Sequence, residues 1–165
     1  MTIRVAFLLA TLVSAVACAQ TEPAPAEAIN RVLDDFHDAA VNGDKVRYLN
    51  HLTADAVFMG TDEQERWPKD PDFSRYVEAH FSDGHGWAYR SVERHVKVGD
   101  RADVAWFDEV VYSETNGRFR GTGVLLRDSN QWKIAHYALS FLVYNEDWDK
   151  VIELTKRTAA EKRGR

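Results

Sequence analysis

The stretch GRFRGTGVLLRDSNQWKIAHYALSFLVY, residues 117–144, decides the fold of this chain. It contains two long runs of alternating side-chain character, joined by the polar turn Asp128-Ser129-Asn130. Alternation with a period of two is typical of β-strands, and a short polar turn between two such runs favours an antiparallel hairpin. The stretch therefore predicts the end of a curved sheet whose inner face lines a pocket.

The second run predicts which side chains face that pocket. One face mixes bulky residues with small and polar ones, as the inside of a cavity does, which makes Trp132 and Ser140 candidate ligand contacts. The opposite face is aromatic and aliphatic, so we expect it to pack against a helix or to form a homodimer through the last strands. The first face carries Trp132, Ile134, His136, Ala138 and Ser140, and the second carries Tyr137, Leu139, Phe141 and Val143.

Length and composition favour one globular domain. The chain has 165 residues, of which 45% are hydrophobic and 28% are charged, so a single core can form without disulfides. The formal net charge of −5 argues against a nucleic-acid partner, because phosphate contacts need a basic face. The sequence therefore favours a small-molecule or protein partner.

The first 19 residues have the pattern of a signal peptide. Arg4 precedes an apolar run over residues 5–16, and Ala17-Cys18-Ala19 forms a small-residue cleavage site. This predicts an exported protein, periplasmic or secreted. In an alternative interpretation Cys18 becomes the acylated first residue of a lipoprotein, and only then is membrane attachment expected. Residues 20–26 follow as a linker rich in proline and alanine.

The remaining chain predicts helices first and strands afterwards. Asp44 is a good N-cap residue for the second helix, and Pro71 suits the first position of the third. A C-terminal helix and basic tail, residues 145–165, follow the domain at 27–144. We expect helices over 29–40, 44–51, 70–84 and from 147 onward, and strands over 54–59, 87–98, 103–113, 118–127 and 131–144.

This order and four motifs resemble the SnoaL-like branch of the nuclear transport factor 2-like superfamily over residues 27–144. The resemblance implies an α+β, cone-shaped fold with three N-terminal helices packed on a curved antiparallel sheet, plus a C-terminal helix. That superfamily includes isomerases, dehydratases, cyclases, epoxide hydrolases and non-catalytic binding domains, so the resemblance implies a pocket and leaves its chemistry open. The motifs are GTDEQERW at 60–67, VAWFDE at 104–109, RGTGVLLR at 120–127 and QWKIAHYALSF at 131–141.

One acidic and one imidazole side chain are the candidate catalytic pair. Alternation allows only one of Asp108 and Glu109 to face inward, and we favour Glu109. A carboxylate inside an apolar cone is expected to have a raised pKa, so Glu109 and His136 would form a general acid/base pair for enolisation, dehydration or cyclisation. The alternative is a structural hydrogen bond between the same two side chains in a binding pocket.

The loop at the mouth of the cone supplies candidate ligand contacts. Trp67 would stack on a ligand, and Asp62 or Glu65 would bond its polar groups. Alternatively, these residues only shape the loop and fill the core. Tyr48 is a possible phenolic donor into the pocket, with a core tyrosine as the alternative.

The sequence predicts no metal and no cofactor, because its histidines lack zinc-site spacing and Gly121-Thr122-Gly123 lacks the third glycine of a dinucleotide loop. Two functions remain. The favoured one is a non-catalytic binding or assembly module with a pocket for a small apolar molecule. The alternative is a cofactor-independent lyase or isomerase that uses Glu109 and His136.

Overall fold

The structure is a computed structural model that describes residues 24–81 and 84–164. The predicted signal peptide at 1–19 and the first four residues of the linker lie outside the described residues. Within the described ranges, no helix is both long enough and apolar enough to span a membrane.

Three helices precede most of the sheet, as the sequence predicts. Asp44 caps α2, because its carboxylate accepts the backbone N–H of Arg47 at 3.0 Å. The third helix starts later than predicted: Asp70 precedes a proline and is extended (φ −118°, ψ 135°), as residues before proline generally are. The helices are α1 (Pro25–Val41), α2 (Lys45–Asn50) and α3 (Ser74–His80), with the π-helical turn η1 (Lys69–Phe73) before α3.

Six strands form one mixed sheet with the order β2-β1-β6-β5-β4-β3. The strands β3 to β6 form the predicted antiparallel meander. The expectation of a wholly antiparallel sheet is wrong, because β1 runs parallel to β6. These two strands are far apart in the chain, so no hairpin fixes their relative direction. The bounds are β1 (Leu52–Met59), β2 (Arg66–Pro68), β3 (Arg90–Val98), β4 (Val104–Ser113), β5 (Gly117–Asp128) and β6 (Gln131–Phe141).

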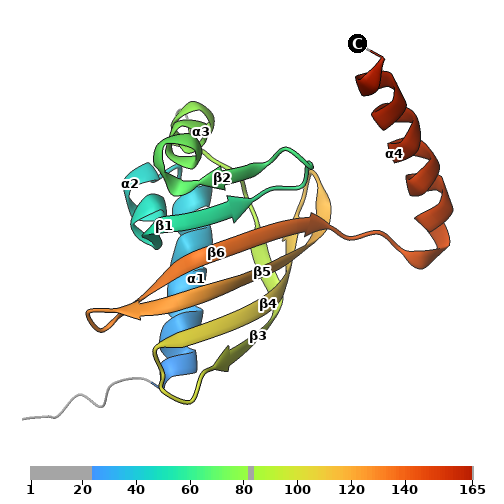
Figure 1. The fold of residues 1–165 in the computed structure, drawn as a ribbon. Helices are drawn as coiled ribbons and strands as arrows, with labels where there is room; N and C mark the ends of the chain where they lie inside the picture. Colours follow the sequence, from blue (N-terminus) through green and yellow to red (C-terminus); the bar gives the residue numbers. More distant parts are fainter. Residues whose placement is uncertain (1–23, 82–83, 165) are drawn as a thin grey trace, which may run out of the picture.

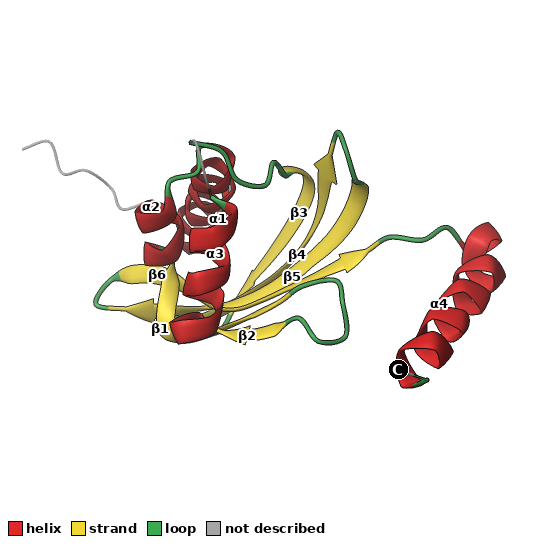
Figure 2. Ribbon diagram, turned by 90° about the horizontal axis from the view of Figure 1, so that it is seen from above, coloured by secondary structure: helices red, strands yellow, loops and turns green. Residues whose placement is uncertain are grey.

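The first three helices all lie on the same face of the curved sheet (Figures 1 and 2). The apolar core fills the space between these two layers. By contrast, α4 (Trp148–Arg163), reached through the short 3-10 turn η2 (Asn145–Asp147), stands away from this body. Near the C-terminal end of α4, Nζ of Lys162 lies 3.6 Å from Oδ2 of Asp62, which belongs to the loop between β1 and β2.

A β-bulge in β6 decides which side chains face the core. Ile134 pairs with Leu125 and His136 pairs with Val124, so Ala135 is an extra residue without a partner in β5. The inward set is Trp132 and Ile134 before the bulge, and Tyr137 and Leu139 after it.

The bulge makes the predicted faces wrong beyond Ala135. His136 and Ser140 do not share the inner face with Trp132, and Ser140 is exposed. Tyr137 and Leu139 are buried, so they do not form the outer apolar face on which the homodimer was predicted. Without the bulge, an uninterrupted period of two would place His136 and Ser140 on the inner face. It would place Tyr137 and Leu139 on the outer face.

Deletion of Ala135 tests the role of this bulge. A one-residue shift turns every side chain of a strand to its other face, so one half of β6 would lose its buried set. We expect the free energy of unfolding in urea to fall by more than about 3 kcal/mol, comparable to losing one or two large core side chains. The substitution Ala135→Ser keeps the bulge and should cost less than about 1 kcal/mol. A deletion variant as stable as Ala135→Ser would contradict this interpretation.

Candidate functional site

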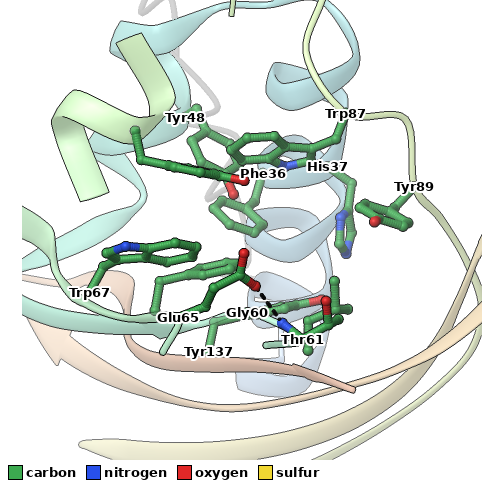
Figure 3. A pocket seen from close by; sticks show the side chains of 13 residues that line it. Phe36, His37, Tyr48, Gly60, Thr61, Glu65, Trp67, Trp87, Tyr89 and Tyr137 are labelled. Carbon is green, nitrogen blue, oxygen red and sulfur yellow. Dashed lines mark hydrogen bonds between the residues drawn. The ribbon is translucent and has the colours of Figure 1, made fainter. Parts of the chain in front are cut away.

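A pocket of about 230 Å³ lies between the helices and the inner face of the sheet (Figure 3). Eight of its lining side chains are aromatic, so its walls are mainly apolar ring surfaces. The helices α1, α2 and α3 contribute Phe36, Tyr48 and Tyr76. The strands contribute Phe58, Trp67 and Tyr137, and the segment before β3 contributes Trp87 and Tyr89.

The rings of the pocket hold one another in place. Phe36 stacks on Tyr48 with the ring centroids 4.2 Å apart, and Trp67 stacks on Tyr76 at 4.4 Å. The rings of Phe58 and Tyr137 are stacked and nearly parallel, with an angle of 5° between their planes. Since aromatic pairs in these offset arrangements are favourable, the walls are preformed.

Behind these rings, the fully buried carboxylate of Glu109 accepts three side-chain hydrogen bonds. Its Oε1 atom is 2.8 Å from His37 Nε2 and accepts the hydroxyl of Tyr137 at 3.0 Å. Its Oε2 atom accepts Nε–H of Arg94 at 2.9 Å. His37 and Tyr137 also line the pocket, so Glu109 orients two of the pocket's polar groups from behind.

The pKa of Glu109 is lowered to about 2. Burial is the largest single influence and raises the pKa, but the hydrogen bond and charge of His37 and the charge of Arg94 together outweigh it. The predicted rise in the pKa of Glu109 is therefore wrong, because the prediction considered burial alone and not the hydrogen-bonding and charged partners His37 and Arg94. At neutral pH Glu109 is a carboxylate and has no proton to donate.

Gly121 provides the space for this network. It pairs with Glu109 across β4 and β5. A Cβ atom at Gly121 would lie 2.5 Å from the Tyr137 hydroxyl and 3.0 Å from Glu109 Cγ, which is too close for either contact to remain. The glycine in this strand is required because two side chains of neighbouring strands meet above it.

The structure brings Glu109 to a histidine, but not to His136. The latter lies beyond the bulge, paired with Val57 and Val124 and turned away from Tyr137. His37 takes its place from α1. Sequence reasoning missed His37, although it follows the buried Leu33 by four residues and so falls on the apolar stripe of that helix.

Tyr48 is almost fully buried, at 1% exposed, and lines the pocket. Its hydroxyl proton has no hydrogen-bond acceptor in the described part of the chain. The Trp87 indole N–H, which lowers the pKa of this hydroxyl, can only donate, so it does not satisfy that proton. Burial raises the pKa of Tyr48 well above its ordinary value, so the hydroxyl stays protonated and is available as a donor.

Of the other predicted ligand contacts, some line the pocket and others lie elsewhere. Glu65 and Trp67 line the pocket. Asp62 does not, and its carboxylate lies near Lys162 on α4. Trp132 borders a different surface groove, beside Val32 and His51, and Ser140 is exposed on the outer side of the sheet. In the described ranges, no group of three or more aspartate, glutamate, histidine or cysteine side chains is arranged so that it could hold a metal ion.

The variant Glu109→Gln tests the energetic role of the network. Because the folded pKa of about 2 lies below the ordinary value of 4.5, the carboxylate stabilises the fold above pH 4.5 and loses this effect as the pH falls towards 2. We expect the free energy of unfolding of the wild type to fall by about 3 kcal/mol across this range, because Glu109 becomes protonated. The variant should be about 3 kcal/mol less stable at pH 7 and should lack this part of the acid dependence.

The exposed Glu114, just after β4, offers the control. Glu114→Gln should change stability by less than about 0.5 kcal/mol. Urea unfolding at several pH values measures all three proteins. An acid dependence that is the same in wild type and Glu109→Gln would contradict the assigned network.

Comparison with known proteins agrees with this architecture. Residues 29–144 match the family profile described as a SnoaL-like domain. A search of curated protein sequences found no match. Among solved structures, an NTF2-like protein of unknown function from Pseudomonas putida superimposes with a TM-score of 0.61 at 15% identity, over 73% of this chain and 88% of that one.

Two further structures show the same fold. One is a candidate ketosteroid isomerase from Shewanella frigidimarina, with a TM-score of 0.56 and 18% identity over 68% of this chain and 94% of that one. The other is a candidate aromatic ring hydroxylase from Novosphingobium aromaticivorans, with a TM-score of 0.60 and 19% identity over 72% and 89%. The family profile spans well over half of the sequence, and the chain therefore belongs to the SnoaL-like domain family, with the fold of the NTF2-like structures.

Proposed function

We propose that this protein binds a small molecule with a mainly apolar surface in the aromatic pocket, and that one polar group of the ligand bonds to Tyr48. The observation that carries the proposal is the buried Tyr48 hydroxyl, whose proton has no acceptor in the described part of the chain. A buried polar group left without a hydrogen bond costs about 1–3 kcal/mol, and such groups are rare in folded proteins. A ligand that supplies the missing bond removes this cost.

The size and walls of the pocket support the same proposal. A cavity of about 230 Å³ suits a molecule of one or two rings or a compact branched group. Its preformed stacked rings lower the entropic cost of binding, because few side chains need to be ordered by the ligand. The names of two structural neighbours, which refer to ketosteroids and to aromatic rings, agree with a ligand of largely apolar surface.

The substitution Tyr48→Phe separates a ligand-binding hydroxyl from a core tyrosine. It keeps the ring that stacks on Phe36 and removes only a hydroxyl whose proton has no acceptor among the described residues, so stability should stay within about 1 kcal/mol of wild type. With 2-naphthol as a fluorescent probe, we expect binding to weaken by about fivefold, whereas binding of naphthalene, which lacks a hydroxyl, should not change.

Tyr144→Phe is the matched control, because Tyr144 is 74% exposed and outside the pocket. It should bind both probes like the wild type. If Tyr48→Phe binds 2-naphthol as well as the wild type, Tyr48 is a core residue only. If neither probe binds to the wild type, the pocket does not have the proposed function.

A second candidate function is proton transfer catalysed by His37. The observation that favours it is the 2.8 Å contact between His37 Nε2 and the Glu109 carboxylate. This alternative uses the uncharged form of His37, in which a carboxylate acceptor keeps the proton on Nε2 and leaves Nδ1 as the basic nitrogen. In this alternative, Nδ1 takes a proton from carbon next to a carbonyl group while Tyr48 donates a hydrogen bond to the carbonyl oxygen. The acid/base group is then His37, with Glu109 as its positioning residue.

Exchange of hydrogen for deuterium in 2-tetralone tests this candidate. The ketone is small, flat and has acidic hydrogens beside its carbonyl. In deuterium oxide, the enzyme hypothesis predicts exchange at least about a hundredfold above the buffer rate and loss of most of that excess in His37→Phe. His95→Phe, which alters an exposed histidine, is the control and should exchange like the wild type. Exchange at the buffer rate in wild type would leave the pocket with binding alone.

A further inference from the structure

We propose that the ligand is a small organic cation, such as an alkylated ammonium group. This inference rests on the proposed binding function and adds the charge of the ligand. It combines a pocket lined by aromatic rings with a carboxylate, Glu65, at the same pocket.

Glu65 gives the pocket its uncompensated charge. Within the described ranges, no lysine or arginine lines the pocket, and Glu65 forms no ion pair. His37, which also lines the pocket, is already bonded to Glu109. The other nearby carboxylate, Glu109, is buried behind the lining and is matched by Arg94. A negatively charged ligand would therefore meet repulsion from Glu65, whereas a cation would be attracted.

The loop holds the Glu65 carboxylate in position before any ligand arrives. Its Oε2 atom accepts the backbone N–H groups of Thr61 at 2.8 Å and Asp62 at 3.1 Å. Gly60 allows this close approach, because a Cβ atom there would lie 2.2 Å from Oε2. Figure 3 shows the second oxygen of Glu65 turned towards the rings of the pocket. One oxygen thus fixes the side chain, and the other is available to a ligand.

The rings around Glu65 provide the second part of a cation site. The charge of Glu65, acting with burial as the larger cause, raises the pKa of Tyr76, which places the carboxylate near that ring. Tyr76 in turn stacks on Trp67, with 4.4 Å between the centroids. A cation is attracted to the negative face of an aromatic ring, and tryptophan is the strongest such partner.

The ring walls also decide the kind of cation. The free oxygen of Glu65 can accept one N–H group of a ligand. The aromatic faces offer no acceptors to the remaining N–H groups of a primary amine and cannot replace the water shell of a metal ion. An alkylated ammonium spreads its charge over methyl or methylene groups, which contact rings without needing acceptors. The pocket of about 230 Å³ has room for such a group and a short substituent that reaches the Tyr48 hydroxyl.

A pair of isosteres isolates the charge of the ligand. Choline and 3,3-dimethylbutan-1-ol have the same shape and hydroxyl, but the first has a quaternary nitrogen where the second has carbon. In isothermal titration calorimetry with the purified protein, we expect choline to bind at least about tenfold more tightly than the alcohol. Equal binding of the two, or tighter binding of the alcohol, would overturn the inference.

Glu65→Gln tests the carboxylate, with Glu63→Gln as the control. The two substitutions remove one negative charge from the same loop, but Glu63 is exposed and does not line the pocket. The amide oxygen of glutamine can still accept the loop N–H groups, so the loop should keep its shape. We expect Glu65→Gln to lose most of the preference for choline and Glu63→Gln to keep it. An unchanged preference in Glu65→Gln would overturn the role of Glu65.

Failure of this inference is distinguishable from failure of the proposed function. If the wild type binds 2-naphthol but shows no preference for choline over its neutral isostere, the pocket binds ligands and the cation inference is wrong. If 2-naphthol, choline and the alcohol all fail to bind, the proposed function itself is wrong and the inference falls with it.

Discussion

The fold depends on how one buried charge is satisfied. The Glu109 carboxylate is completely inaccessible, and an unpaired carboxylate in such a place would cost several kcal/mol. Its three partners come from three different elements: His37 from α1, Arg94 from β3 and Tyr137 from β6. Forming all three contacts at once fixes the helix layer relative to the sheet and fixes the register of β6.

The same network explains how the pocket divides its polar groups. Glu109 engages His37 Nε2 and the Tyr137 hydroxyl, so these groups are oriented by the protein and have less capacity left for a ligand. Tyr48 and Glu65 differ, since among the described residues the proton of the first lacks an acceptor and the second is bonded only by loop N–H groups through one oxygen. The two carboxylates therefore have different roles. Glu109 lies behind the lining and holds its polar groups, whereas Glu65 is itself part of the lining.

The local parts of this structure could be predicted from the sequence, and the long-range contacts could not. Alternation predicts β3 to β6 with their hairpins, and Asp44 predicts the start of α2, because these signals depend on neighbours in the chain. The pKa of Glu109 depends on His37, 72 positions away. The bulge at Ala135 also leaves no sequence signal, because both faces of β6 carry apolar residues and either register appears consistent.

The bulge that defeats the sequence pattern also determines the chemistry of the pocket. In a regular strand His136 would face the cone in place of Tyr137, and the pocket would gain an imidazole. The bulge supplies instead a tyrosine whose pKa is raised well above its ordinary value by burial first and then by the Glu109 charge. A phenol of this kind remains a neutral donor near neutral pH, so its bond to Glu109 does not change with moderate shifts of acidity. Because of the bulge, β6 adds no second imidazole beside His37, which is held by Glu109. Glu65 therefore stays the one carboxylate among the described residues that line the pocket, as the cation inference requires.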